Sequence, residues 1–178
     1  MQNFLLNRRD FLKLSGLTGL ALAGDLIIPD LGFAKPNKHL RKKLSPCLDN
    51  LSEKIIFLES SWDPSAYRAD TNATGLMGVT PIVLREWNEI RGKKTQSHTS
   101  SDLFNPIINV KIGSWYLHDR IGKVYIPCYD LKNTPENMLA CYNAGPVKIA
   151  KLGITDAVED FKKLPSQTRE YIKKYWGL

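Results

Sequence analysis

Glu59 is the residue of this sequence best placed to transfer a proton. It follows the last of four apolar residues at helical spacing, which are Leu48, Leu51, Ile55 and Leu58. A carboxyl group beside such an apolar face is partly withdrawn from water, and desolvation raises its pKa. A carboxylic acid that keeps its proton near neutral pH can act as a general acid. From this helix alone, however, an exposed helix-end residue without a chemical role is the better supported interpretation.

Local signals predict the bounds of the helix that carries Glu59. It should run from about Cys47 to Glu59, because Ser45 can cap it and Pro46 suits its first turn. Asp63-Pro64 then stops it, since a residue before proline is driven away from helical geometry.

A polar loop and a second helix follow. Residues 65–74 are polar, and Gly75 permits a close backbone approach or a positive φ. Thr80 then serves as an N-cap and Pro81 as a first-turn proline, so a second helix should extend to about Ile90. The residues expected to pack from this helix are Ile82, Leu84 and Trp87.

Two later helices should help to build the core. Asn109, Gly113 and Leu117 fall on one stripe of a helix, where Gly113 lets another helix approach closely. The stretch from Leu164 to Trp176 predicts a final helix packed back on the core, with Arg169 as a salt-bridge candidate.

Tyr142 and Asn143 lie near the end of a further predicted helix. Gly145 can form a left-handed cap there and Pro146 blocks continuation. The Tyr142 hydroxyl and the Asn143 amide therefore sit at a helix end, where side chains can reach a cleft. The pattern by itself favours the simpler alternative for Tyr142, an ordinary core tyrosine with its hydroxyl at the surface.

Residues 1–34 have the features of an export signal. The run Asn7-Arg8-Arg9-Asp10-Phe11-Leu12-Lys13 precedes a weakly apolar stretch, Leu14–Ala23. This resembles the twin-arginine signal family, which implies export of the folded protein. We expect cleavage after Ala34, with Ala23 as a competing site, and an uncleaved amphipathic anchor as the alternative.

The composition favours one exported domain of ordinary size. The chain has 178 residues and a hydrophobic fraction of 43%, which suits a globular protein. No apolar run approaches the ~20 residues of a membrane helix, so no stable span is expected after signal cleavage. Residues 35–46 should form a basic linker and residues 47–178 the folded domain, located in the periplasm or the cell wall.

The net charge of +7 arises beyond residue 34, because basic and acidic residues cancel within 1–34. A basic surface attracts polyanions such as nucleic acid, anionic lipid or acidic wall polymer. The lysines are scattered rather than clustered with aromatic residues, which argues against a nucleic-acid site.

The cysteines and histidines suggest neither a cofactor nor a metal. One pair among Cys47, Cys128 and Cys141 could be bridged in an oxidising compartment, but their spacing matches no zinc pattern. A nucleophilic pair of Cys141 and His118 is disfavoured, because Cys141 lies in an apolar helical stretch where a small buried thiol is common.

Four blocks, in order, resemble the lytic transglycosylase family related to goose-type lysozyme. The first has the pattern Glu-Ser-x-Trp-x-Pro-x-Ala from Glu59, then Gly75-Leu76-Met77 and a proline. The second comprises Asn105-Pro106, Asn109, Gly113, Tyr116 and Leu117, and the third is Leu139–Pro146. The fourth comprises Leu164-Pro165, Thr168, Arg169, Tyr171 and Ile172. The resemblance covers roughly residues 47–178.

The resemblance implies a compact, lysozyme-like all-α domain with a substrate groove. Such enzymes cleave the β-1,4 bond between N-acetylmuramic acid and N-acetylglucosamine in peptidoglycan glycan strands. A single Glu first protonates the leaving oxygen, and the muramic acid 6-hydroxyl then closes on the anomeric carbon to give a 1,6-anhydro end. The same Glu takes the hydroxyl proton, which explains why one carboxylate suffices where ordinary glycosidases need two.

The resemblance also assigns expected roles to residues. Glu59 is the acid and then the base, and Tyr142 is the hydroxyl that helps to orient it. Met77 and Asn143 are expected in the substrate groove. Ser60 and Gly75 belong to the same site, with Ser60 supporting the helix end.

The sequence departs from the family where substrate is bound. Gly78 and Thr80 replace the usual Gln and Met, and Arg68-Ala69-Asp70 stands where a Ser is usual. These changes put saccharide preference in doubt. The role of the enzyme in wall turnover, in division or with an envelope-spanning secretion or motility machine is left open.

Two alternatives remain at this point. A goose-type hydrolase needs a second carboxylate about 6.5–9.5 Å from Glu59 to activate water. Asp63 and Asp70 are the nearest in sequence. The other alternative is a non-catalytic wall-binding or assembly protein that kept the fold. Gly78 and Thr80 favour it, and the retained Glu59 and Tyr142 oppose it.

Overall fold

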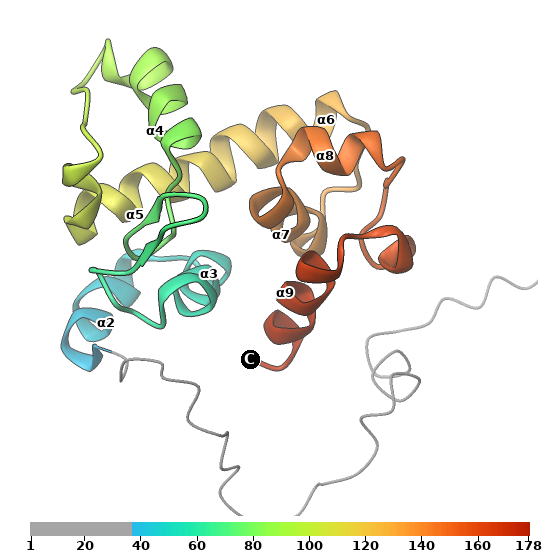
Figure 1. Cartoon of the computed structure of the whole chain (residues 1–178), viewed down its shortest axis with the longest axis horizontal. Helices are drawn as coiled ribbons and strands as arrows, with labels where there is room; N and C mark the ends of the chain where they lie inside the picture. The colour runs from blue at the N-terminus through green and yellow to red at the C-terminus, as the bar shows by residue number, and fades with distance from the viewer. Residues whose placement is uncertain (1–36) are drawn as a thin grey trace, which may run out of the picture. The chain divides into compact units, whose positions relative to one another are not determined.

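The computed structural model describes residues 37–178, so the predicted signal at residues 1–34 lies outside the described part. Helices dominate that part, and strands β1 (Tyr67–Arg68) and β2 (Ala73–Thr74) form a short antiparallel hairpin (Figure 1). The α-helices are α2 (Lys38–Leu44), α3 (Asn50–Ser60), α4 (Pro81–Trp87), α5 (Pro106–Trp115), α6 (Ile126–Cys128), α7 (Pro135–Ala144), α8 (Pro146–Lys151) and α9 (Ser166–Trp176). The 3-10 turns are η1 (Ser45–Cys47), η3 (Ser101–Phe104) and η5 (Phe161–Lys163), and the π-helical segments are η2 (Asn88–Gly92) and η4 (Tyr116–Tyr125). The predicted all-α fold is confirmed.

Helix α3 begins at Asn50, later than the predicted Cys47. Asp49 is its N-cap, because the Asp49 carboxylate accepts a hydrogen bond from Ser52 N at 3.0 Å. The predicted cap, Ser45, instead begins η1 and donates its hydroxyl hydrogen bond to Glu53 Oε1 at 3.1 Å.

The buried face of α3 differs in part from the predicted one. Ile55 is fully buried, as the spacing predicted, but Ile56 is equally buried beside it. Leu51 and Leu58 are only half-buried. Helix α3 contacts α9, so a helix near the start of the described part and the last helix are neighbours (Figure 1).

The segment predicted as a basic linker contains helix α2, which has no buried residue. Arg41 of α2 pairs with Glu53 of α3, with 2.9 Å between Arg41 Nη2 and Glu53 Oε1. The same guanidinium lies over the Trp62 ring, 5.9 Å from its centroid. These contacts attach α2 to the segment that follows it.

Helix α4 begins as predicted, with Thr80 as N-cap and Pro81 in the first turn. It continues into η2, so this helical stretch extends to Gly92. Leu84 and Trp87 are buried as expected. Ile82 is 66% exposed, which corrects the expectation that it packs in the core.

Segments α5, η4 and α6 follow one another without a break and form one long helical stretch (Figure 1). Asn109, Gly113 and Leu117 are all buried along it, as the spacing predicted. Gly113 does not face another helix, however. It faces the side chain of Met77, and a Cβ at Gly113 would lie 2.6 Å from Met77 Sδ.

Helix α7 ends at Gly145, whose φ is +87° and ψ is 136°, so its φ is positive but its geometry is not that of a left-handed helical residue. Pro146 then begins α8 rather than only stopping a helix. Helix α9 matches the predicted final helix and contacts α7 as well as α3. Arg169 Nη1 donates to Leu164 O at 2.6 Å in place of the predicted salt bridge.

We expect Gly113→Ala to lower the free energy of unfolding by about 1–3 kcal/mol, because the new methyl group overpacks the core against Met77. Gly122→Ala is the matched control, since a Cβ there would meet Met138 Cε at an ordinary 3.5 Å. Urea unfolding followed by circular dichroism measures both. Equal stability of the two variants would show that Met77 moves aside without cost.

Candidate active site

The Glu59 carboxyl is buried at the end of α3, with its side chain only 7% exposed. Its Oε1 accepts a hydrogen bond from the Tyr171 hydroxyl at 2.8 Å, and its Oε2 lies 3.5 Å from Arg68 Nη2. Burial raises the pKa of Glu59, while the Tyr171 hydrogen bond and the Arg68 charge oppose that rise. The raised pKa is the direction that a general acid requires.

The chain leaves Glu59 through an unusual turn. Ser61 and Trp62 have φ values of +51° and +68°, although neither is glycine. Each such residue costs about 1–2 kcal/mol, so surrounding contacts must hold the turn. Trp62 is 1% exposed, and Ser60 Oγ lies 2.9 Å from Leu76 O and 3.0 Å from Ile56 O. Ser60 therefore joins the end of α3 to the loop after the hairpin.

Asn109, on α5, holds that loop in place through hydrogen bonds from its buried side chain. Its Oδ1 accepts from Met77 N at 2.8 Å, and its Nδ2 donates to Thr74 O at 2.7 Å and Leu103 O at 2.8 Å. Gly75 is buried with a φ of +75°, and a Cβ there would lie 2.3 Å from Asn109 Nδ2. Gly75 therefore shapes the loop from a buried position.

Met77 and Tyr142 meet through the backbone of this loop. The Met77 side chain is fully buried, so it does not lie in the groove as expected. Its carbonyl accepts the Tyr142 hydroxyl hydrogen bond at 2.8 Å. Burial first, and then the nearby Glu59 charge, raise the pKa of Tyr142 well above its ordinary value. Tyr142 thus lies near Glu59, but the hydroxyl that donates a hydrogen bond to Glu59 is that of Tyr171.

Tyr171 is a site residue that sequence reasoning did not single out. It lies on the buried face of α9, one turn after Thr168, whose hydroxyl donates to Asn143 Oδ1 at 2.9 Å. A buried tyrosine usually needs a hydrogen-bond partner for its hydroxyl, which was the available signal. The sequence could not tell that the partner lies on α3.

A groove of about 640 Å³ runs beside this cluster. Tyr142 and Asn143 of α7 line it, as do Gly78 and Thr80, two of the residues that depart from the expected pattern. A Cβ at Gly78, whose φ is +56°, would lie 2.9 Å from Glu59 Oε2. The Glu59 carboxyl therefore lies directly behind the groove wall at Gly78.

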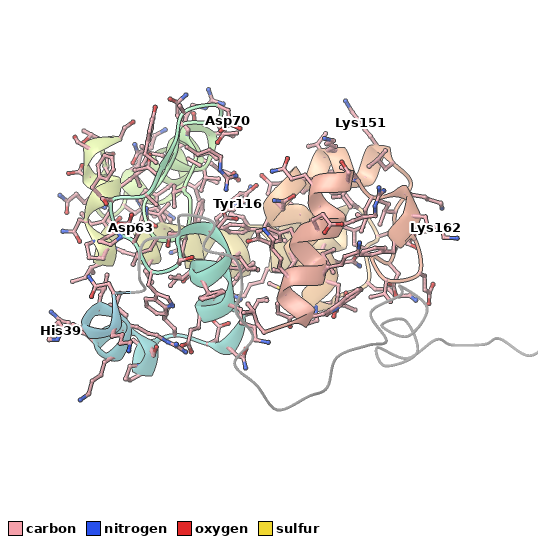
Figure 2. The ribbon with its side chains drawn as sticks, turned by 60° about the horizontal axis from the view of Figure 1, so that its bottom comes forward. His39, Asp63, Asp70, Tyr116, Lys151 and Lys162 are labelled. Carbon is pink, nitrogen blue, oxygen red and sulfur yellow. The ribbon has the colours of Figure 1, made fainter. Side chains whose placement is uncertain are left out.

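Aromatic residues form much of the groove beyond Tyr142. Tyr116 lies 6.0 Å from Tyr142 between ring centroids and 6.4 Å from Tyr125. Figure 2 labels Tyr116 between the hairpin side and the α7–α9 side of the described part. Glu86, a carboxylate that sequence reasoning did not consider, also lines the groove and accepts the Tyr125 hydroxyl hydrogen bond at 2.7 Å. Arg120 pairs with the same carboxylate.

The two aspartates considered as second carboxylates have other environments. Asp63 Oδ1 accepts from Ser65 N at 2.9 Å and from Ser65 Oγ at 2.6 Å, so it stabilises its own turn. Asp70 is exposed in the hairpin loop (Figure 2).

The cysteines in the described part are free thiols. Cys141 is fully buried, and burial raises the pKa of its thiol to about 12. His118 Nε2 lies 2.9 Å from Asp49 Oδ2, so its partner is the α3 cap. Within residues 37–178, His, Cys, Asp and Glu form no group of three suited to a metal, and no helix is long and apolar enough to cross a membrane.

Comparison with known proteins places this geometry in a family. The profile of the transglycosylase SLT domain matches residues 46–164, more than half of the chain. The chain belongs to this family. A solved structure, the 70 kDa soluble lytic transglycosylase SLT70 from Escherichia coli, is similar with a TM-score of 0.58 and 26% sequence identity. The match covers 80% of this chain but only 23% of SLT70, and no curated protein matches the chain.

The buried Glu59 should make the stability of this SLT domain depend on pH. Folding raises the pKa of Glu59 above its ordinary value of 4.5, so the folded protein holds this proton more tightly than the unfolded chain does. Its contribution to the free energy of unfolding is therefore largest below about pH 4.5 and falls as the pH rises through the folded-state pKa.

Glu59→Gln cannot ionise, so it should gain stability relative to the wild type from about pH 4 to about pH 8. Urea unfolding at both pH values measures the difference in the free energy of unfolding between Glu59→Gln and the wild type. Glu89→Gln, at an exposed position of η2, is the control because its carboxyl is not buried. If the difference in the free energy of unfolding between Glu59→Gln and the wild type did not change with pH, this would contradict the raised pKa of Glu59.

We also expect Gly78→Ala to lower kcat/KM by on the order of 10-fold or more, because its methyl group would displace Glu59 Oε2. Gly153→Ala is the matched control. Gly153 also has a positive φ, +64°, but a Cβ there meets nothing within 4 Å. Steady-state kinetics on the glycan substrate proposed below compares the two. An equal loss in both variants would assign the effect to backbone strain.

Proposed function

We propose that this protein is a peptidoglycan lytic transglycosylase in which Glu59 transfers the proton. The proposed bond is the β-1,4 linkage from N-acetylmuramic acid to N-acetylglucosamine in the glycan strand. The observation that carries the proposal is the buried Glu59 carboxyl, held on one oxygen by Tyr171 and adjacent to the groove residue Gly78. Membership of the SLT family supports the same class of enzyme.

The proposed reaction begins with proton donation. The Glu59 carboxylic acid gives its proton to the glycosidic oxygen as the C1–O bond of the muramic acid breaks, and the N-acetylglucosamine leaves with a free 4-hydroxyl. The muramic acid O6 then bonds to C1, and its proton passes to the Glu59 carboxylate. The acid form is restored, no water is consumed, and the product carries a 1,6-anhydro ring.

A single carboxyl suffices for this sequence, because the nucleophile belongs to the substrate. A hydrolase would need a second carboxylate to activate water. Glu86 is the carboxylate of the groove wall, but it already accepts the Tyr125 hydrogen bond and pairs with Arg120. A carboxylate engaged in this way is a poor base for water, which favours the transglycosylase over the hydrolase.

The groove suits a charged polysaccharide. Tyr116 and Tyr142 offer aromatic surface for sugar rings, and Asn143 presents an amide beside them. Lys148 and Lys151 line the same groove from α8 and are exposed, with Lys151 extending outward in Figure 2. A basic rim attracts an acidic wall polymer.

The remaining predicted site residues act as supports in this proposal. Met77 supplies its carbonyl to Tyr142, Ser60 joins α3 to the loop, and Gly75 lets Asn109 reach that loop. Gly78 and Thr80 lie on the groove wall, so their replacement of bulkier residues should alter saccharide contacts.

The organisation around the catalytic domain also belongs to the proposal. Residues 1–34 would act as a twin-arginine type export signal, and 35–46 as a linker before the domain at 47–178. The protein would then work in the periplasm or the cell wall, on wall turnover, division or the passage of an envelope-spanning machine.

The test is mass spectrometry of the sugars that the purified protein releases from peptidoglycan. We expect muropeptides with 1,6-anhydro ends, lighter by one water than reducing ends. Glu59→Gln should lower the rate of release by about 10²–10⁴-fold, because it removes the general acid. Glu89→Gln, exposed on η2, should release the same products at the wild-type rate.

Other products would overturn the proposal. Reducing ends would indicate a hydrolase and direct attention to Glu86. Binding to the wall without release of sugars would indicate a protein that kept the fold and lost the chemistry.

A further inference from the structure

The two oxygens of Glu59 are not equivalent. Oε1 accepts the hydrogen bond from Tyr171 at 2.8 Å. Oε2 faces Gly78, where the absence of a side chain leaves it room, and lies 3.5 Å from Arg68 Nη2. An oxygen that already accepts a hydrogen bond is the poorer place for the acidic proton, so the proton of the carboxylic acid belongs on Oε2. This is the oxygen that must reach the substrate.

We propose that Arg68 is a positioning residue for the proton transfer, whose guanidinium stabilises the negative charge on Glu59 Oε2 after the proton has left. This inference rests on the proposed function and adds a residue to it. Arg68 does not touch the bond that breaks. It acts through Glu59.

The hairpin delivers Arg68 to this position from a fixed base. Arg68 pairs with Ala73 across the hairpin, and Ala73 and Thr74 are buried. Thr74 also bridges to Val79, on the far side of the Gly75 turn. The strand that carries Arg68 is thus tied to the loop that contains Gly78. The guanidinium and the groove wall are positioned as one unit.

The difference in burial makes the pair effective. The Arg68 side chain is 44% exposed, so its charge keeps much of its hydration, whereas the Glu59 side chain is 7% exposed. A cation that stays partly in water avoids most of the desolvation cost of a buried ion pair. Its field nevertheless acts on an oxygen that water screens poorly.

The separation between the two groups also matters. A distance of 3.5 Å is longer than the 2.7–3.2 Å of an N–H···O hydrogen bond, so Arg68 acts by charge and leaves Oε2 free for the substrate. The other titratable groups that face Glu59 are the hydroxyls of Tyr171 on α9 and Tyr142 on α7. Within the described residues, Arg68 is therefore the cation paired with this carboxyl.

The proposed reaction makes opposite demands on Glu59, which burial and Arg68 meet separately. Burial favours the protonated acid that begins the reaction. The Arg68 charge favours the carboxylate that exists between the two proton transfers. Removing that charge should make Glu59 a weaker acid, and a weaker acid donates its proton more slowly.

The test is a ¹³C NMR titration of the Glu59 carboxyl carbon in the full-length chain. We expect an upward shift of the Glu59 pKa in Arg68→Gln and a smaller shift in Arg68→Lys, which keeps a positive charge. Arg85→Gln is the control, because it removes the same charge from an exposed position of α4. Its Glu59 titration should match the wild type. An unchanged titration in Arg68→Gln would overturn the inference.

Kinetics provide the second readout. In Arg68→Gln the alkaline limb of the kcat/KM profile should move to higher pH, and the plateau should fall by on the order of 10-fold. A plateau that falls without movement of the limb would reduce Arg68 to a structural role. The NMR titration needs no turnover, so a protein that releases no anhydro products overturns the proposed function whatever the titration shows. A wild type that does release them, with no shift in Arg68→Gln, overturns this inference alone.

Discussion

The candidate active site depends on the burial of one carboxyl group. A buried carboxyl loses its hydration, and this loss is tolerated only where partners or protonation compensate. Glu59 receives one hydrogen bond, from Tyr171 near the other end of the chain, and a partial counter-charge from Arg68. Compensation is therefore incomplete, and burial raises the pKa of Glu59 above its ordinary value. The residues around Glu59 bury the carboxyl and so keep water from stabilising its charged form.

Asn109 gives this arrangement its rigidity. Its side chain makes three hydrogen bonds to backbone groups, all from a fully buried position on α5. These bonds fix the loop whose carbonyl holds Tyr142 and whose Gly78 faces Glu59. The loop can lie so close to α5 because Gly75 and Gly113 lack side chains where Asn109 and the Met77 side chain pass. Gly75 and Gly113 thus permit close packing, in addition to the turn geometry that Gly75 provides.

The sequence predicted what is decided locally and missed what is decided across the fold. Thr80-Pro81 opened a helix and Asn109 lay on a buried stripe, because capping and helical periodicity need only near neighbours. Ser45 and Asp49 are both good N-cap residues. Asp49 caps the helix, while the Ser45 hydroxyl donates a hydrogen bond to Glu53. Similarly, the sequence singled out the tyrosine of α7 and listed that of α9 only as part of a family block. Which hydroxyl reaches Glu59 depends on the contact between α3 and α9, and no spacing rule encodes that contact.

The departures from the family pattern fall on one side of the carboxyl. Gly78 and Thr80 lie on the groove wall, and Arg68 stands at the outer edge of Glu59, whereas Tyr171 and Asn109 hold the carboxyl and its loop from within. In the proposed enzyme, changes on the groove side can alter which saccharide fits without disturbing the packing that raises the pKa of Glu59. Glycine at position 78 leaves space beside Glu59 Oε2, and Arg68 brings a positive charge to that same oxygen. In the proposed enzyme, Gly78 sets the space beside Oε2 and Arg68 sets the charge beside it, so substrate fit and acid strength depend on this one oxygen.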